Sequence, residues 1–126
     1  MTGSAKRYLK SHAINELNEQ LVIAVMDDPG NGGACHHYKI NVPPETPIDN
    51  VKILFQNGGI AEHGVNGISN EALLAIVEDR LLGFQSGQFP SREGAVALTK
   101  IQEALMWLHK RTRDRVNRGV EGKHLQ

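Results

Sequence analysis

The chain has one cysteine, six aromatic residues and no long apolar run, and each shortage excludes a class of protein. Its single cysteine, Cys35, excludes an internal disulfide and a four-cysteine zinc site and favours a cytosolic compartment. The longest apolar runs, Leu21–Met26 and Ala72–Val77, fall far short of the roughly 20 residues that cross a bilayer, so we expect no membrane segment. So few aromatic side chains favour an oligomer in which subunits complete one another's core.

Net charge is also absent, because fourteen basic residues balance fourteen acidic ones. This balance disfavours a nucleic-acid binder that is basic overall, but it leaves room for a local basic patch. The length of 126 residues suits one domain. We predict a β-rich part over residues 14–68 and a helical hairpin over 69–119, with terminal tails at 1–13 and 120–126.

The first half of the chain has short β-prone runs separated by glycine, proline and asparagine. We predict an antiparallel sheet from four strands, the last of them weaker: Glu19–Met26, His36–Val42, Val51–Gln56 and Ile60–Val65. The link Asp27–Ala34 is typical of a wide hairpin loop. The three prolines within Asn41–Asn50 exclude regular pairing there.

The second half has a helical period. Ser69 is a plausible N-cap for a helix that ends near Gly83, and Ser91 begins a second helix whose natural stop is Gly119. This second helix of about 27 residues would be roughly 40 Å long, more than a small domain needs, so part of it should pack on another subunit. The predicted fold class is α+β, an N-terminal antiparallel β-sheet followed by a C-terminal two-helix antiparallel hairpin.

A helical wheel assigns one face of the second helix to the core, formed by Ala97, Leu98, Ile101, Ala104, Leu105 and Leu108. Lys100, Trp107, Arg111 and Arg118 line up beside this face, and Arg115 nearly continues it beyond Leu108. An arginine row along a core edge should face a partner subunit or a buried anion.

The basic run Lys110–Arg118 has two interpretations. Its cations could merely complement the negative end of the helix macrodipole. Alternatively, Arg111 and Arg115, one turn apart, could grip one diphosphate, because a guanidinium offers forked donors to phosphate oxygens. Phe84 is likewise either a core residue that closes the hairpin or a platform on which a base stacks, worth about 1–3 kcal/mol.

Other motifs carry less chemistry. The loop Pro29–Ala34 lacks the Lys-Ser/Thr pair of a phosphate-binding loop and is better explained as a hairpin turn. His36 and His37 point to opposite faces of a strand, so we expect no metal site, even with Cys35 and His63 nearby. No catalytic motif is present, so we expect neither catalytic residues nor a cofactor, and an enzyme is disfavoured.

Several motifs together resemble one family. The stretch Val65–Gly83 with the later segments Phe84-Gln85, Glu103–Leu108 and Arg111–Arg113 resembles the helical domain of phage sponge proteins, which sequester nucleotide second messengers of bacterial immunity. Anti-CBASS cyclic-oligonucleotide sponges share this helical domain. The motifs PGNGGACHHYKI, ILFQNGGI and GVNGI resemble more narrowly the first type of Thoeris anti-defence protein, and the likeness runs from about Ile14.

The resemblance implies a homo-oligomer, commonly a hexamer, that acts in the cytoplasm of the infected bacterium. Pockets between subunits would bind glycocyclic ADP-ribose, and cyclic di- and trinucleotides, without hydrolysis. Phe84 matches the adenine-stacking aromatic, and Arg111 and Arg115 match the phosphate-contacting arginines. Gly94 stands where the family usually has a pocket-lining asparagine. We assign a second ligand site to Arg113 and Arg118.

Two other functions stay open. The arginines could serve a small oligomeric nucleic-acid-binding or regulatory module, whose affinity would fall steeply with salt. A phosphodiesterase that degrades the messenger is the third interpretation.

Overall fold

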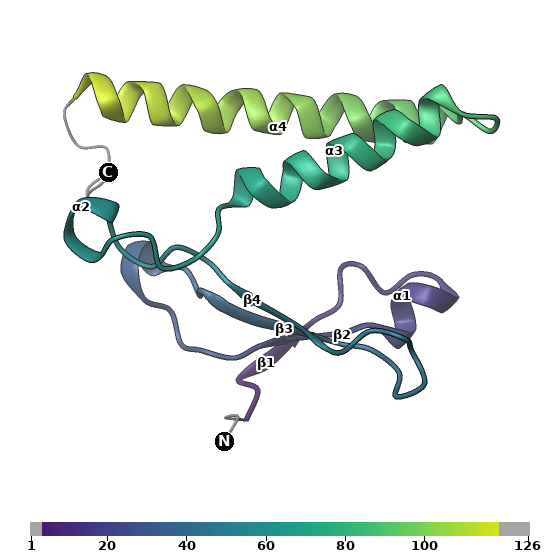
Figure 1. Cartoon of the computed structure of the whole chain (residues 1–126), viewed down its shortest axis with the longest axis horizontal. Helices are drawn as coiled ribbons and strands as arrows, with labels where there is room; N and C mark the ends of the chain where they lie inside the picture. Colours follow the sequence, from purple (N-terminus) through teal and green to yellow (C-terminus); the bar gives the residue numbers. More distant parts are fainter. Residues whose placement is uncertain (1–3, 119–126) are drawn as a thin grey trace. The chain divides into compact units, whose positions relative to one another are not determined.

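The computed structural model describes residues 4–118 (Figure 1), and the chain divides into two compact units, Met1–Ile68 and Ser69–Gln126. The boundary coincides with the change from β-prone to helical sequence, and the α+β class is confirmed. That the two units form a single domain stays a prediction. Within the described residues, no helix is both long and apolar enough to cross a membrane.

The first unit is built on a four-stranded antiparallel sheet with the order β1-β2-β3-β4. Its strands are β1 (Arg7–Leu9), β2 (Val22–Val25), β3 (His37–Asn41) and β4 (Val51–Leu54). Val25 lies opposite Arg7 on one side and Tyr38 on the other. With Ala24 and Cys35, Val25 forms the buried core of this unit.

Three predictions for this unit are wrong. The predicted strand Glu19–Met26 begins only at Val22, because Asn15 caps the helix α1 (Glu16–Gln20) through a 2.9 Å hydrogen bond from the Asn18 N–H to the Asn15 side chain. The segment predicted as a tail at 1–13 contains β1. The predicted fourth strand at Ile60–Val65 is instead the one-turn helix α2 (Ile60–His63), which ends at Gly64 with a φ of 68°.

The two links between strands follow the prediction, except that Asn41 still belongs to β3 and pairs with Val22. Residues 26–36 join β2 to β3 as a loop with a short 3-10 turn at Asn31–Gly33. Residues 43–50 contain no strand. The chain then returns beside the end of β4, where Phe55 and Ile68 form a parallel bridge. Gly67 permits this approach, because a Cβ there would lie 2.4 Å from the backbone carbon of Phe55.

The second unit is the predicted antiparallel hairpin of α3 (Asn70–Ser86) and α4 (Arg92–Asn117), which pack along one another. Both predicted caps are confirmed: Ser69 accepts a hydrogen bond from the Ala72 N–H, and Ser91 accepts one from the Gly94 N–H. α3 continues three residues beyond Gly83, because one glycine in an exposed helix costs only about 1 kcal/mol. Gly119, the predicted stop of the second helix, lies outside the described residues, and Arg118 is the C-cap.

The helices meet along two stripes of half-buried residues. On α3 the stripe contains Glu71, Leu74, Glu78, Leu81 and Gln85; on α4 it contains Gly94, Leu98, Ile101, Ala104, Leu105, Leu108, Thr112 and Arg115. Arg115 therefore continues the apolar stripe, as the wheel predicts. Ala97, which the wheel assigned to the core face, is exposed, because it lies at the edge of the stripe.

Candidate functional site

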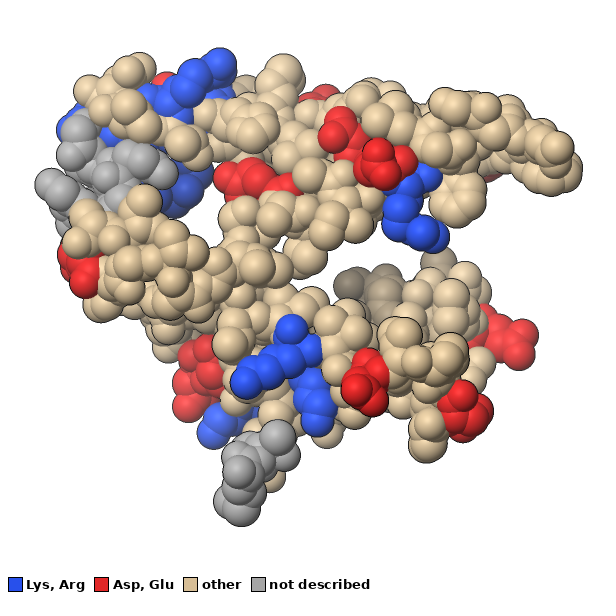
Figure 2. Space-filling view, viewed as in Figure 1, with Lys and Arg blue, Asp and Glu red and all other residues tan. Residues whose placement is uncertain are grey.

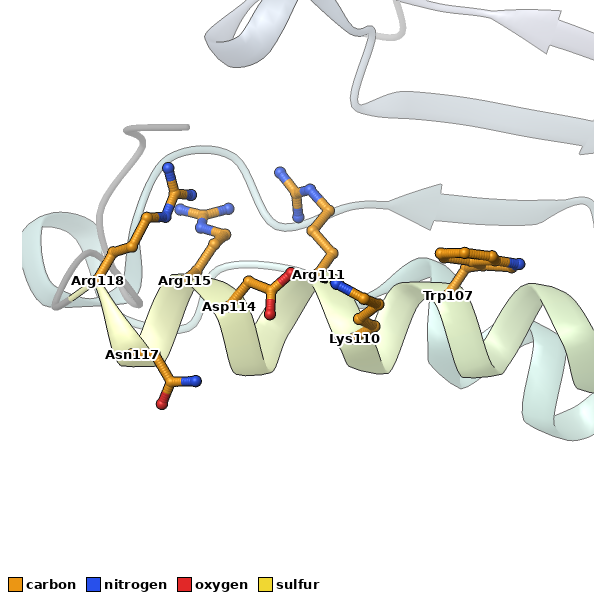
Figure 3. Close-up of a pocket in the computed structure, with 7 residues that line it drawn as sticks. All are labelled: Trp107, Lys110, Arg111, Asp114, Arg115, Asn117 and Arg118. Atoms are coloured by element: carbon orange, nitrogen blue, oxygen red, sulfur yellow. Dashed lines mark hydrogen bonds and ion pairs between the residues drawn. The ribbon is translucent and has the colours of Figure 1, made fainter.

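Basic side chains gather at the C-terminal end of α4 (Figure 2), where they border an open hollow. The described residues that line it all come from this helix and its C-cap: Trp107, Lys110, Arg111, Asp114, Arg115, Asn117 and Arg118. Figure 3 shows the side chains of Arg111, Arg115 and Arg118 projecting to one side of α4, while Asn117 points to the other. Within residues 4–118 the lining thus has four basic residues and one acidic residue, which suits an anionic ligand.

Asp114, the acidic residue among the described lining residues, is paired with a basic neighbour. The Lys110 ammonium donates a 2.8 Å hydrogen bond to the Asp114 carboxylate one turn later, and this bond lowers the pKa of the Asp114 carboxyl below its ordinary value. Asp114 therefore stays ionised and engaged with Lys110. Among the described lining residues, the remaining charged groups are the guanidinium groups of Arg111, Arg115 and Arg118.

The macrodipole does not explain the position of Arg111. Charge–dipole attraction is confined to the last turn of a helix. Arg111 precedes the final helical residue, Asn117, by six positions and so lies beyond that turn. Its place beside Arg115 and Arg118 on the hollow favours a ligand-binding role over a purely structural one.

Phe84 is 58% exposed in the last turn of α3, so the interpretation as a buried core residue is wrong. The guanidinium of Arg80 lies 5.4 Å from the centre of its ring, a cation–π contact between residues one turn apart. The ring remains accessible for stacking.

Gly94 lies in the first turn of α4, half-buried beneath the side chain of Gln85. That side chain holds the backbone of Ser91 from both sides: its Nε2 donates to the Ser91 carbonyl at 3.0 Å, and its Oε1 accepts from the Ser91 N–H at 3.2 Å. A Cβ at position 94 would lie 2.7 Å from Gln85 Oε1. In the sequence Gln85 stands out only within the segment Phe84-Gln85 that resembles the family, and no local pattern predicts its contact with Gly94.

The site residues predicted from the sequence occupy opposite ends of the hairpin. Gly94 and Arg111 are seventeen residues apart in one continuous helix, which places them about 25 Å apart. Ligand pockets of about 300–1,000 Å³ are only roughly 8–12 Å across. One chain therefore cannot bring the Phe84 end and the arginine end to the same small ligand.

The two ends nevertheless share one face of the hairpin. On a helical wheel of α3, Phe84 lies about 100° around the helix axis from the stripe that meets α4. On the wheel of α4, Trp107 and Arg111 lie about 100° from the stripe that meets α3, in the same rotational direction. The two helices run in opposite directions and face each other. An equal rotation away from the contact stripe on each helix therefore leads to the same face of the hairpin. We call this face, which carries Phe84, Trp107 and Arg111, the arginine face. Arg113 is rotated the other way and does not line the hollow, whereas Arg118 does.

The histidine and asparagine motifs of the first unit hold loops together. A His36 ring nitrogen lies 3.1 Å from the Asn31 carbonyl oxygen, and the Asn31 side chain donates to that of Asn57 at 2.8 Å. The loop before β3 is thus a structured turn, as predicted. Among residues 4–118, no group of three His, Cys, Asp or Glu side chains is placed to hold a metal ion.

Comparison with known proteins links the hairpin to a family. The profile of the family described as "Acb2/Tad1, hairpin domain" matches residues 47–113, more than half of the chain. The protein "Thoeris anti-defense 1" of Bacillus phage SBSphiJ7 is 57% identical over 70 residues, which cover 56% of this chain and 49% of that relative. The match thus spans about half the length of the relative. The family profile includes Phe84, Gly94, Arg111 and Arg113 but stops before Arg115, and the wider resemblance from Ile14 stays a prediction.

Proposed function

The chain belongs to the Acb2/Tad1 hairpin-domain family, and from that membership we propose that it is a phage anti-defence sponge. It would bind glycocyclic ADP-ribose, and also cyclic di- and trinucleotides, in the cytoplasm of the infected bacterium and keep them from their receptor without degrading them. The name of the Bacillus phage relative, "Thoeris anti-defense 1", supports this role.

The observation that carries the proposal is the set of arginines on one flank of α4. Arg111 and Arg115 are one turn apart and border the same hollow, so their guanidinium groups can each donate paired hydrogen bonds to a diphosphate. Phe84 would stack on the adenine. A second ligand site with Arg113 and Arg118 is part of this proposal; Arg118 borders the same hollow, whereas Arg113 lies on the other flank of α4.

The separation of about 25 Å between the two ends favours a site built from two chains. Two hairpins can pack with their arginine faces together, related by a two-fold axis that lies between the faces and runs perpendicular to the helix axes. This symmetry brings Phe84 of one chain to Arg111 of the other. Two identical sites would result, each with an aromatic end and an arginine end. A hexamer would contain three such pairs.

Apolar residues left on the hairpin surface support assembly. Ile76, Val77 and Val96 are between 42% and 60% exposed. Exposed apolar side chains that gather into a patch mark protein interfaces in soluble proteins. Burial of this surface between subunits would also stabilise a chain with so few aromatic residues.

The electrostatics of the hollow support binding without hydrolysis. General-base catalysis needs a group whose pKa lies near the working pH. Asp114 is the only carboxylate among the described lining residues, and its pKa is held below the ordinary range by Lys110. It would therefore be a poor base for activating water.

The test is a release experiment. The protein is incubated with glycocyclic ADP-ribose, the small-molecule fraction is removed, and the protein is heat-denatured before the supernatant is analysed by mass spectrometry. Intact messenger in the supernatant is expected, and an Arg111→Glu variant should release far less. Cleaved product would show an enzyme. The nucleic-acid-binding alternative would be favoured by a different pair of results. The messenger would then stay in the small-molecule fraction, and the protein would retain nucleic acid with an affinity that falls steeply with salt.

A further inference from the structure

Trp107 is the only tryptophan of the chain, and it is 60% exposed on α4. It lies off the stripe that meets α3, whose neighbouring members are Leu105 and Leu108. The core of the hairpin therefore does not account for this large side chain. Its indole borders the same hollow as Arg111, on the side of α4 to which the guanidinium groups project (Figure 3).

Trp107 precedes Arg111 by one turn, about 6 Å along the helix axis. Phosphate oxygens bound at Arg111 would thus leave the rest of a nucleotide close to the indole. A flat, exposed indole beside a cationic anion site is suited to an aromatic base, because bases stack on aromatic side chains through their π-faces. An adenine has two such faces, and the proposed site assigns one of them to Phe84.

We infer that Trp107 binds the messenger directly by stacking on its adenine, so that Phe84 of one chain and Trp107 of its partner enclose the same base. This inference rests on the proposed function and adds a specificity-determining residue to it. It also predicts a preference for ligands that carry a purine base over those that carry only the diphosphate.

Fluorescence tests this inference, because excitation of the indole reports on Trp107 alone. Titration of the full chain with glycocyclic ADP-ribose should quench or shift the emission in a saturable way, with the midpoint that calorimetry gives. Inorganic pyrophosphate, which has no base, should displace the messenger at high concentration and leave the emission of the free protein unchanged.

Two substitutions and a matched control complete the test. Trp107→Ala should weaken calorimetric binding at least tenfold, while Trp107→Phe, which keeps an aromatic face, should stay within about threefold of the parent. Met106 is 57% exposed on the other flank of α4, so Met106→Ala should bind like the parent. Light scattering should give the same oligomer for all four proteins.

The outcomes separate this inference from the proposed function. If the parent binds the messenger with unchanged emission and Trp107→Ala binds equally well, the inference fails and the sponge proposal stands. If Trp107→Ala dissociates into smaller species, Trp107 is an interface residue and the inference also fails. If calorimetry detects no binding to the parent protein, the proposed function itself fails.

Discussion

The Oε1 atom of Gln85 occupies the space above the α-carbon of Gly94, where a Cβ would approach it to 2.7 Å. The same amide makes two hydrogen bonds to the backbone of Ser91. One side chain thus joins the last turn of α3 to the start of α4, in a position that leaves no room for a Cβ at residue 94. The family asparagine that the resemblance implies at this position would require Gln85 to move.

The first prediction is that Gly94 and Gln85 are energetically coupled. In a Gln85→Ala background, the close neighbour that remains for a Cβ at position 94 is the Ser91 Oγ, at 2.9 Å. There Gly94→Ala should stabilise the hairpin by about 0.5–1 kcal/mol, because alanine is the better helix former. In the parent, the new methyl group displaces Gln85 and weakens bonds worth about 0.5–1.5 kcal/mol each, so the gain should vanish or reverse. Urea unfolding of the four proteins measures this coupling. Equal effects of Gly94→Ala in both backgrounds would contradict it.

The second prediction separates the geometry of arginine from its charge. Arg111→Lys and Arg115→Lys keep the positive charge but lose the forked donors, and each charge-assisted hydrogen bond is worth about 1.5–3 kcal/mol. Affinity for glycocyclic ADP-ribose should therefore fall at least tenfold in calorimetric titrations. Arg113→Ala is the control, because Arg113 does not line the hollow and should change affinity by less than about threefold. Binding lost only in Arg113→Ala would place the pocket on the other flank of α4.

The third prediction concerns acid stability of the first unit. Burial raises the pKa of the Asp27 carboxyl, but hydrogen bonds from the N–H groups of His36 and His37 lower it below the ordinary value overall. A carboxyl with a lowered folded-state pKa adds stability that is present above its unfolded pKa of about 3.9 and is lost as pH falls through the folded value.

Asp27→Asn should therefore destabilise the protein at pH 7, by roughly 1 kcal/mol given the partial exposure of the carboxyl, and by much less at pH 2. Urea unfolding at both pH values provides the measurement. The control is Asp28→Asn, since Asp28 makes only an exposed, 3.8 Å pair with Lys6. A destabilisation by Asp27→Asn that is equal at both pH values would show that the charge of Asp27 is not responsible.

Local signals explain which parts of the fold could be predicted. Ser69 and Ser91 were recognisable as caps because a serine bonds to an N–H three residues ahead, within one short stretch of sequence. β1 has only three residues and depends on pairing with β2 far along the chain, so no local pattern revealed it. The same holds for α2, whose single turn is set by the glycines that flank it rather than by an apolar period.

The candidate site, like the fold, could be predicted only where local sequence spacing determines it. The helical period placed Arg111 and Arg115 one turn apart and Arg113 on another flank, and the structure agrees. The exposure of Phe84 and the packing of Gln85 over Gly94 depend on side-chain contacts between two helices, which one-dimensional periodicity does not contain. The wheel therefore located the arginines but left the role of Phe84 open.

The most direct measurement is subunit complementation, because the site should need Phe84 from one chain and Arg111 from another. Phe84→Glu and Arg111→Glu should each form oligomers that fail to bind glycocyclic ADP-ribose, since every site then contains one defective end. Coexpression of the two variants should restore about one site in four with parental affinity, because half of the pairs would be mixed and each mixed pair would have one intact site. If the coexpressed protein binds no messenger although both variants fold and assemble, the site does not combine these two residues across chains.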